Sequence, residues 1–488
     1  MGSHQSHENK TDKTEAVSGN STPRGSQRGS SRSGSGGDLQ GLQEKVEKPP
    51  PSMVPVEKLG KLLAQRSREE DGINGVTEKC FTKYLFPMYP ELARQFYKYI
   101  HRVGKCKNKH IPLSTFRQHC ERILSMLDDA VIIDTYVRMF GAETDDNMMT
   151  PDGFRSLLYT SYKLSMDHYP EGPQTCLMID KTLTAVVKGC FNNKDSHSIG
   201  FVVRWLEEHC HRLIFPIHRY CVHVLATRHR DIESSRAGDL PTPVLELGTP
   251  VLERAAPLPL SVAWLLAAAA PPLYSRPLHA PAPTPAYGLS SASWLARLVC
   301  AVPSHWVPLY CSRDHGLGAN RFLHHTTAYR GPTIVVIEAD GVTCIVCAPQ
   351  EWRETHQYWG TADTALMQLY PAFALIERAP RMLYLNTSIR GYPKGLRAGS
   401  DPRNPLLSIP EDFDTITFQG VPYTLIAIQV WGCGDQASRD TQLDIKKWQV
   451  REAERQRQVK LSAAEWIEHP DRYLLELAGR QVYNNTAQ

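Results

Sequence analysis

The sequence predicts an α+β protein in which an N-terminal helical half precedes a half of antiparallel β-strands. Apolar residues recur at three- and four-residue steps through residues 56–230, which is typical of amphipathic helices. Short β-branched and aromatic runs separated by Gly, Pro, Asn and Asp then fill residues 305–434, and residues 435–488 return to a helical, charged pattern. At ~150 residues per domain, the 488 residues are enough for two or three folded units.

Composition favours a protein without a nucleic-acid partner. The 55 basic residues nearly balance the 51 acidic ones, which leaves a formal net charge of +4. No secretory leader precedes the 12 cysteines, so we expect reduced and mostly buried thiols. The longest apolar run, at 257–273, is shorter than the ~20 residues of a membrane-spanning helix, and we expect no transmembrane segment.

The N-terminal arm, residues 1–55, is rich in Ser, Gly and charged residues, and we expect it to be disordered. It begins MGSHQS, and Gly2 with Ser6 fits the pattern for N-myristoylation, although so short a motif also arises by chance. A single acyl chain binds membranes only marginally, so a stable anchor would need a second contact.

The helical domain, residues 56–230, carries a weak repeat that is EF-hand-like. An apolar residue is followed five positions later by a phenylalanine that opens a helical run, in the pairs Val76 and Phe81, Ile111 and Phe116, and Met149 and Phe154. The position that should supply a bidentate glutamate is instead Cys80, Thr115 or Gly153. The pattern therefore predicts scaffold helix pairs without calcium.

Two groups of metal- or redox-type residues are better explained by packing. Cys344 and Cys347 form a CxxC inside a predicted strand, where three-residue spacing points the two sulfurs to opposite faces. A denser group of histidines and cysteines comprises His209, Cys210, His211, His218, Cys221 and His223. It lacks a second pair of ligands at the spacing that a zinc site requires. We expect no metal site and no cofactor.

The connector, residues 231–304, is rich in Pro and Ala and is least structured at 280–288 (APAPTPAYG). Within it, SVAWLLAAAA is expected to form a short helix that docks on a core, because an exposed Trp264 would favour aggregation. Further along, Asp340-Gly341 separates two apolar strands and predicts a hairpin turn.

The C-terminal extension, residues 435–488, is predicted to contain a helix that is polar on nearly all sides and a last helix from Pro470 to Gly479. Helices of this kind are exposed to solvent or dock on another surface, on this chain or on a partner protein. The candidate partner-binding residues are Arg451, Arg455, Leu474, Leu475 and Leu477.

The stretch LYCSRDHGLGANRF at 309–322 raises the question of catalysis. Ser312, Asp314 and His315 are the residue types of an acyl-transfer triad, yet they lie within four consecutive positions. A triad needs side chains that converge from separate elements, so we expect no catalytic residue here.

The same stretch is followed in order by YRGPTIVVIEADG, QYWG, YLN, EDFD and VWG, and together these blocks resemble the TLDc domain family. The matching positions are Ser312, His315, Gly316, Asn320, Phe322, Gly331, Pro332, Trp352, Trp359, Gly360, Asn386, Trp431 and Gly432. Two positions depart from the family pattern: Gln429 stands where glutamate is usual, and the glycine-rich loop at 394–400 is loosened.

The resemblance implies a two-sheet antiparallel β-sandwich flanked by helices, with no active site. The order of the domains resembles the lysosomal, TOR-associated members of the family. This implies a non-enzymatic adaptor at the cytosolic face of the lysosome, with a lipid anchor at Gly2 and with V-ATPase subunits and TOR pathway components as partners. The alternative is a cytosolic protein of oxidation resistance, acting indirectly or through a thiol such as Cys311. A calcium sensor is a third and weaker reading.

Overall fold

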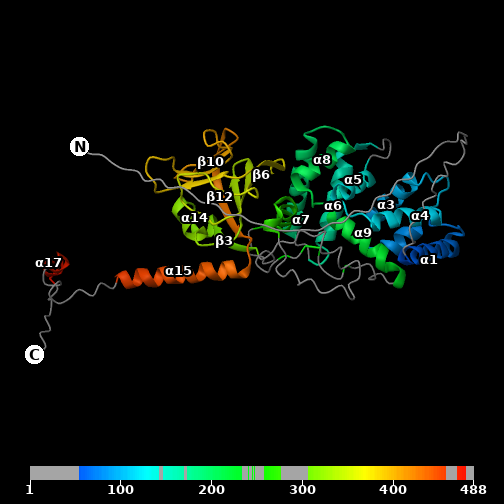
Figure 1. Cartoon of the computed structure of the whole chain (residues 1–488), viewed down its shortest axis with the longest axis horizontal. Helices are drawn as coiled ribbons and strands as arrows, with labels where there is room; N and C mark the ends of the chain where they lie inside the picture. The colour runs from blue at the N-terminus through cyan, green and yellow to red at the C-terminus, as the bar shows by residue number, and fades with distance from the viewer. Residues whose placement is uncertain are drawn as a thin grey trace, which may run out of the picture. The chain divides into compact units, whose positions relative to one another are not determined.

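The computed structural model describes residues 54–141, 147–169, 173–233, 240, 244–245, 247, 258–275, 306–457 and 470–479 (Figure 1). The chain divides into two units, Met1–Pro50 and Pro51–Gln488. Gly2, the arm up to residue 53 and the APAPTPAYG stretch at 280–288 lie outside the described residues.

The first half of the described chain is helical. Its elements are α1 (Val54–Asp71), α2 (Glu78–Cys80), the π-helical η1 (Phe81–Leu85), α3 (Pro90–Val103), α4 (Leu113–Leu124), α5 (Asp129–Met139), β1 (Met148–Met149), α6 (Pro151–Ser165), α7 (Pro173–Phe191), β2 (His197–Ser198), α8 (Ile199–Cys210), α9 (Phe215–Thr227) and the 3₁₀ turn η2 (Arg228–Arg230).

Side-chain caps fix where several of these helices begin. The Thr77 hydroxyl accepts a hydrogen bond from the Cys80 amide, and the Thr150 hydroxyl accepts one from the Gly153 amide. Short antiparallel contacts join the loops between helices: Val76 and Ile111 exchange two backbone hydrogen bonds of 2.9 Å each, and Met149 pairs with His197. The loops are thus fixed by backbone pairing.

The second half is an antiparallel β structure. Its strands are β3 (Val307–Cys311), β4 (Thr333–Ala339), β5 (Val342–Ala348), β6 (Ala365–Tyr370), β7 (Ala374–Arg378), β8 (Leu383–Asn386), β9 (Gly395–Ala398), β10 (Leu407–Ile409), β11 (Thr415–Phe418) and β12 (Val421–Gly432). The hairpin predicted at Asp340-Gly341 is confirmed, because β4 and β5 pair with Ala339 opposite Val342.

The described strands follow one continuous order, β7-β6-β5-β4-β12-β11-β10-β9-β8, with β3 also paired to β12. The expected two sheets are therefore joined. The reason is the length of β12: Val421–Thr424 pair with β11, whereas the residues from Leu425 onward pair with β4. Apolar side chains from both groups of strands, such as Val335 and Leu385, share one core.

The other face of the sheet packs with the helices. Cys347 and Phe373 belong to the same apolar core as the helical half, whereas Cys344 faces the core between the strands. The two sulfurs of the CxxC thus point to opposite faces, as strand geometry requires. The Phe373 amide also donates a hydrogen bond to the Ala185 carbonyl of α7 at 2.8 Å, so backbone bonding as well as apolar packing joins the helical half to the sheet.

The remaining helices and turns come later in the chain than η2. They are α11 (Leu260–Ala269), the 3₁₀ turn η3 (Pro272–Tyr274), α13 (Ser312–His315), α14 (Ala319–Thr326), α15 (Gln436–Arg457) and α17 (Pro470–Leu477). Trp264 on α11 is buried, and its ring meets that of Tyr162 with centroids 5.4 Å apart. Within the described ranges, no helix has the length and apolar character needed to cross a bilayer.

Candidate functional site

Tyr329 explains several glycines of the sequence pattern. Its ring is fully buried, and its hydroxyl accepts a hydrogen bond from the Gly434 amide at 2.8 Å. A Cβ on Gly432 would lie 2.6 Å from the Tyr329 Cζ, and one on Gly331 would lie 2.9 Å from its Cε1. Only glycine leaves room for the ring at these positions, so both glycines are structural.

The Ser312, Asp314 and His315 group is built as a turn. The Ser312 hydroxyl accepts a hydrogen bond from the Ile428 amide of β12 at 2.9 Å, and the His315 Nδ1 accepts one from the Cys311 amide at 3.1 Å. Both polar side chains are therefore engaged with backbone. The Gly316 carbonyl accepts a hydrogen bond from the Tyr310 hydroxyl at 2.8 Å, which closes the turn.

Aromatic signature residues form the centre of the strand core. Phe322 of α14 meets Trp352 edge-on at 5.1 Å, and Trp352 meets Trp359 edge-on at 5.4 Å. The Trp352 indole donates to the Thr333 hydroxyl at 2.8 Å, which satisfies its buried N–H. These contacts hold α14 on the strands.

The other signature positions also contact backbone or core. Asn386 is buried and donates to the Ile389 and Pro393 carbonyls at 3.0 and 3.1 Å, so it fixes the loop after β8. The Pro332 carbonyl accepts from the Cys433 amide at 2.7 Å, and the Gly360 carbonyl accepts from the Arg381 amide at 3.2 Å. Trp431 is buried, whereas Asn320 is exposed on α14.

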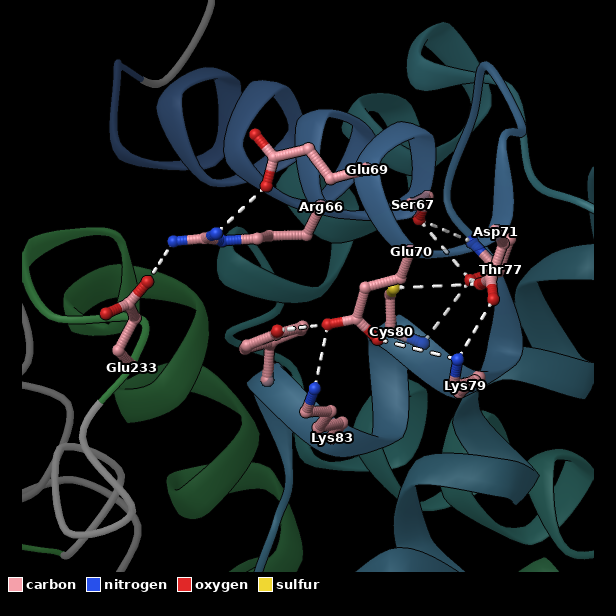
Figure 2. Close-up of polar contacts among 11 residues, drawn as sticks. Arg66, Ser67, Glu69, Glu70, Asp71, Thr77, Lys79, Cys80, Lys83 and Glu233 are labelled. Carbon is pink, nitrogen blue, oxygen red and sulfur yellow. Dashed lines mark hydrogen bonds and ion pairs between the residues drawn. The ribbon is translucent and has the colours of Figure 1, made fainter.

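A second polar group lies where α1 meets the first loop (Figure 2). The Asp71 carboxylate accepts from the Thr77 hydroxyl at 2.8 Å and from the Lys79 ammonium at 3.1 Å. Glu70 accepts from Lys83 at 2.8 Å and from the Tyr84 hydroxyl.

The hydrogen bonds from Lys83 and Tyr84 lower the pKa of Glu70 to about 2. Those from Thr77 and Lys79 lower the pKa of Asp71. Lysine ammonium groups therefore contact carboxylates that could otherwise bind a cation.

The histidines and cysteines of the helical half are core residues. Burial lowers the pKa of His218 to about 4, and its Nδ1 lies 3.2 Å from the Tyr136 hydroxyl. Burial raises the pKa of Cys221 to about 12. In the part of the chain that the structure describes, no three His, Cys, Asp or Glu side chains form a group able to hold a metal ion.

The thiols near the strands are equally shielded. Cys311 is buried and its pKa is raised by that burial, and burial raises the pKa of Cys344 to about 12. The thiolate is the reactive form of cysteine, so these side chains are poorly placed for redox chemistry.

The predicted partner-binding residues lie on the two last helices. Arg451 and Arg455 are exposed on α15, where Arg455 pairs with Glu452 at 3.1 Å. Leu474 and Leu477 of α17 are 63 and 84 % exposed, whereas the side chain of Leu475 lies outside the described ones.

Sequence reasoning missed two apolar residues of α15, because the many charges of this helix predict a polar surface on nearly all sides. Trp448 and Val450 are 63 and 57 % exposed. A tryptophan within a charged helix is the signal that could have identified them.

These contacts define an antiparallel β domain in which the signature residues pack the core and form turns. Residues 288–425 match the family described as the TLDc domain, so the chain carries a TLDc domain over this range. The match begins in the connector, ahead of the expected boundary at residue 305. None of the curated proteins matches the chain.

Proposed function

We propose that this protein is a non-enzymatic adaptor at the cytosolic face of the lysosome, where it binds V-ATPase subunits and supports TOR signalling. The TLDc domain at residues 288–425 supports the family part of this proposal. The pump and the TOR pathway come from the resemblance of the domain order to lysosomal members of that family.

The observation that carries the proposal is the contrast between the first and second halves of α15. Near its start, the buried Gln442 side chain donates to the His325 and Thr327 carbonyls at 3.0 and 3.2 Å. Further along, Trp448 and Val450 are exposed. Large aromatic side chains contribute strongly to protein interfaces, so the first half of α15 is anchored and the second half is suited to a partner.

Lipidation of Gly2 is part of the same proposal. A myristoyl chain alone gives marginal, reversible membrane binding. Contact with the pump through α15 and α17 would supply the second attachment, so neither alone would hold the protein stably on the lysosome.

The experiment is a pull-down from lysosome-rich membranes with the wild type, Gly2→Ala, Ser3→Ala as its matched control, and a chain ending after Gly434. Pump subunits should be recovered with the wild type and Ser3→Ala, reduced with Gly2→Ala and lost with the shortened chain. Failure of the wild type to recover the pump would overturn the proposal.

We also propose that the helical half consists of EF-hand-like helix pairs that take no calcium. The reciprocal hydrogen bonds of Val76 and Ile111 support the pairing of their loops. The absence of calcium binding is supported by two ion pairs, Lys79 with Asp71 and Lys83 with Glu70, because each lysine occupies a carboxylate that calcium would need. Calorimetric titration with calcium should give no micromolar uptake, and saturable uptake would contradict this proposal.

An oxidation-resistance role would act through the pump. The burial of Cys311 and its raised pKa speak against a thiol reaction at that residue. A peroxide assay on the purified protein should show no turnover that depends on Cys311, so wild type and Cys311→Ser should behave alike.

A further inference from the structure

A cavity of about 690 Å³ lies beside β8 and β9. Tyr358 and Tyr384 of the QYWG and YLN blocks line it, whereas none of the individual matching positions named above does. Its size falls within the ~300–1,000 Å³ range of small-molecule sites. The lining residues come from separate segments of the chain, and they include His356, Tyr358, Arg381, Tyr384, Tyr392 and Arg397.

Backbone pairing brings the aromatic residues of this cavity together. Trp359 and Leu383 exchange two hydrogen bonds of 2.7 and 2.9 Å, and this places Tyr358 next to Tyr384 of β8. The two tyrosine rings are stacked, with centroids 5.2 Å apart and an interplanar angle of 28°. His356 and Tyr392 form a second ring pair at 5.5 Å. The cavity therefore offers flat apolar surfaces.

Two arginines give the cavity a positive charge. Arg397 of β9 lies directly opposite Tyr384 in the strand register, so both side chains stand on one face of the sheet. Arg381 precedes β8 and is exposed. Within the described residues neither arginine forms an ion pair, whereas Arg378 pairs with Asp363 at 3.0 Å and Lys394 with Glu411 at 2.8 Å.

Polar atoms at the cavity have unused hydrogen-bonding capacity. The Arg397 Nε and the Tyr358 hydroxyl are buried, and neither makes a well-formed hydrogen bond among the described atoms, although the two side chains lie within reach of each other. Burial raises the pKa of Tyr358, and the charge of Arg397 and its side-chain contact with the phenol oppose that rise, so the phenol stays protonated beside a cation.

The carboxylates next to the cavity accept hydrogen bonds from backbone amides of the loop between β9 and β10. Asp401 accepts from the Arg403 amide at 2.9 Å, and Glu377 accepts from the Ser400 amide at 3.2 Å. Neither carboxylate pairs with Arg397 or Arg381 among the described residues, so an anion entering the cavity would meet arginine N–H groups that no carboxylate occupies.

We propose that this cavity binds a small aromatic anion, a planar ring that carries a phosphate as in a mononucleotide. The planar guanidinium of an arginine suits bidentate contact with phosphate, and Arg397 and Arg381 supply two such groups. The ring of the ligand stacks on the tyrosine and histidine rings. This inference is independent of the pump and of the C-terminal helices.

Calorimetric titration of the full chain tests the proposal with three probes: AMP, inorganic phosphate and adenosine. AMP should bind at least about tenfold more tightly than either of the other two, because it alone engages both the rings and the arginines. Equal affinity for AMP and phosphate, or no measurable binding of AMP, would overturn the proposal.

Point variants localise the binding. Arg397→Gln and Arg381→Gln should each lower the affinity for AMP by about tenfold or more, since each removes a charged hydrogen-bond donor. The control is Arg403→Gln, at an exposed arginine in the loop between β9 and β10 that does not line the cavity. It should bind AMP within about twofold of the wild type. If Arg397→Gln does not fold, Arg381→Gln decides, because Arg381 is exposed and, within the described residues, its one hydrogen bond runs from its backbone amide to the Gly360 carbonyl. Unchanged binding in Arg381→Gln would then contradict the proposal.

Discussion

Tyr329 illustrates, at the scale of residues, how one buried side chain can dictate several distant positions of the sequence. Gly331 and Gly432 lack a Cβ that would meet its ring, and the Gly434 amide donates to its hydroxyl. The sequence pattern marks two of these glycines, yet their common cause becomes visible only when the chain returns through β12. Contacts over such separations cannot be read from local spacing.

Gly432→Ala should destabilise the protein, because the new methyl group would press against the buried Tyr329 ring. We expect the free energy of unfolding to fall by about 2 kcal/mol, as measured by urea denaturation. Gly200→Ala is the matched control, since it sits in α8 and a Cβ added there would meet no atom within 4 Å. The control should be neutral or stabilising by up to about 1 kcal/mol, and equal losses would contradict the explanation.

The pH dependence of stability should include a contribution from His218. Its pKa is about 4 in the folded protein, below the ~6.5 of an unfolded chain, so the unfolded state binds the proton more readily. The contribution is complete above about pH 6.5 and is lost as pH falls toward 4, with a slope of up to about 1.4 kcal/mol per pH unit.

Urea denaturation between pH 7 and pH 5 measures this slope. His218→Gln should make it shallower, and the same substitution at the exposed His168 should retain the wild-type pH dependence. His211, whose pKa is also lowered to about 4 by burial, would keep part of the slope in either variant. An unchanged slope in His218→Gln would rule out the assigned role.

At the scale of elements, local pattern was most informative where it was strongest. The β-branched runs of β4 and β5 and the capped start of α6 are visible in the sequence, and the structure contains all three. The strands β6 (ALMQLY) and β9 (GLRA) are not visible in the sequence, because their residues lack the β-branched pattern and their pairing depends on distant neighbours.

The attachment of α15 to the TLDc domain should depend on Gln442. Gln442→Ala removes both hydrogen bonds to the carbonyls at the C-terminal end of α14, so α15 should exchange its amide hydrogens about tenfold faster while the strands keep their protection. Hydrogen exchange followed by mass spectrometry measures this. Gln449→Ala, on an exposed position of the same helix, should leave the exchange of α15 unchanged. Similar exchange in both variants would show that Gln442 is no anchor.

At the scale of the whole molecule, the sequence predicts a helical half followed by a β half, and the described architecture confirms this order. The strong periodicity of the helices and the β-branched runs made this possible. The shared core was not predictable, because it depends on which face of the sheet the helices cover. Phe373, Trp205 and Cys347 belong to that core although they come from separate parts of the chain.

The same limit applies to the candidate sites. The sequence identified the TLDc pattern, and the family match at residues 288–425 supports it. It could not identify the arginine- and tyrosine-lined cavity, since strand register alone places Tyr384 opposite Arg397. The sequence also could not show that Gln442 of α15 is buried whereas Trp448 of the same helix is exposed.

The central claim is that the TLDc pattern is structural and that partner binding belongs to the C-terminal helices. The most direct measurement is the fraction of V-ATPase recovered from lysosome-rich membranes by Trp448→Ser and by Ser312→Ala, each compared with the wild type. We predict that Trp448→Ser recovers less than about a tenth of the wild-type amount, as expected for loss of an aromatic anchor, and that Ser312→Ala recovers the wild-type amount. Full recovery by Trp448→Ser together with loss in Ser312→Ala would contradict the account.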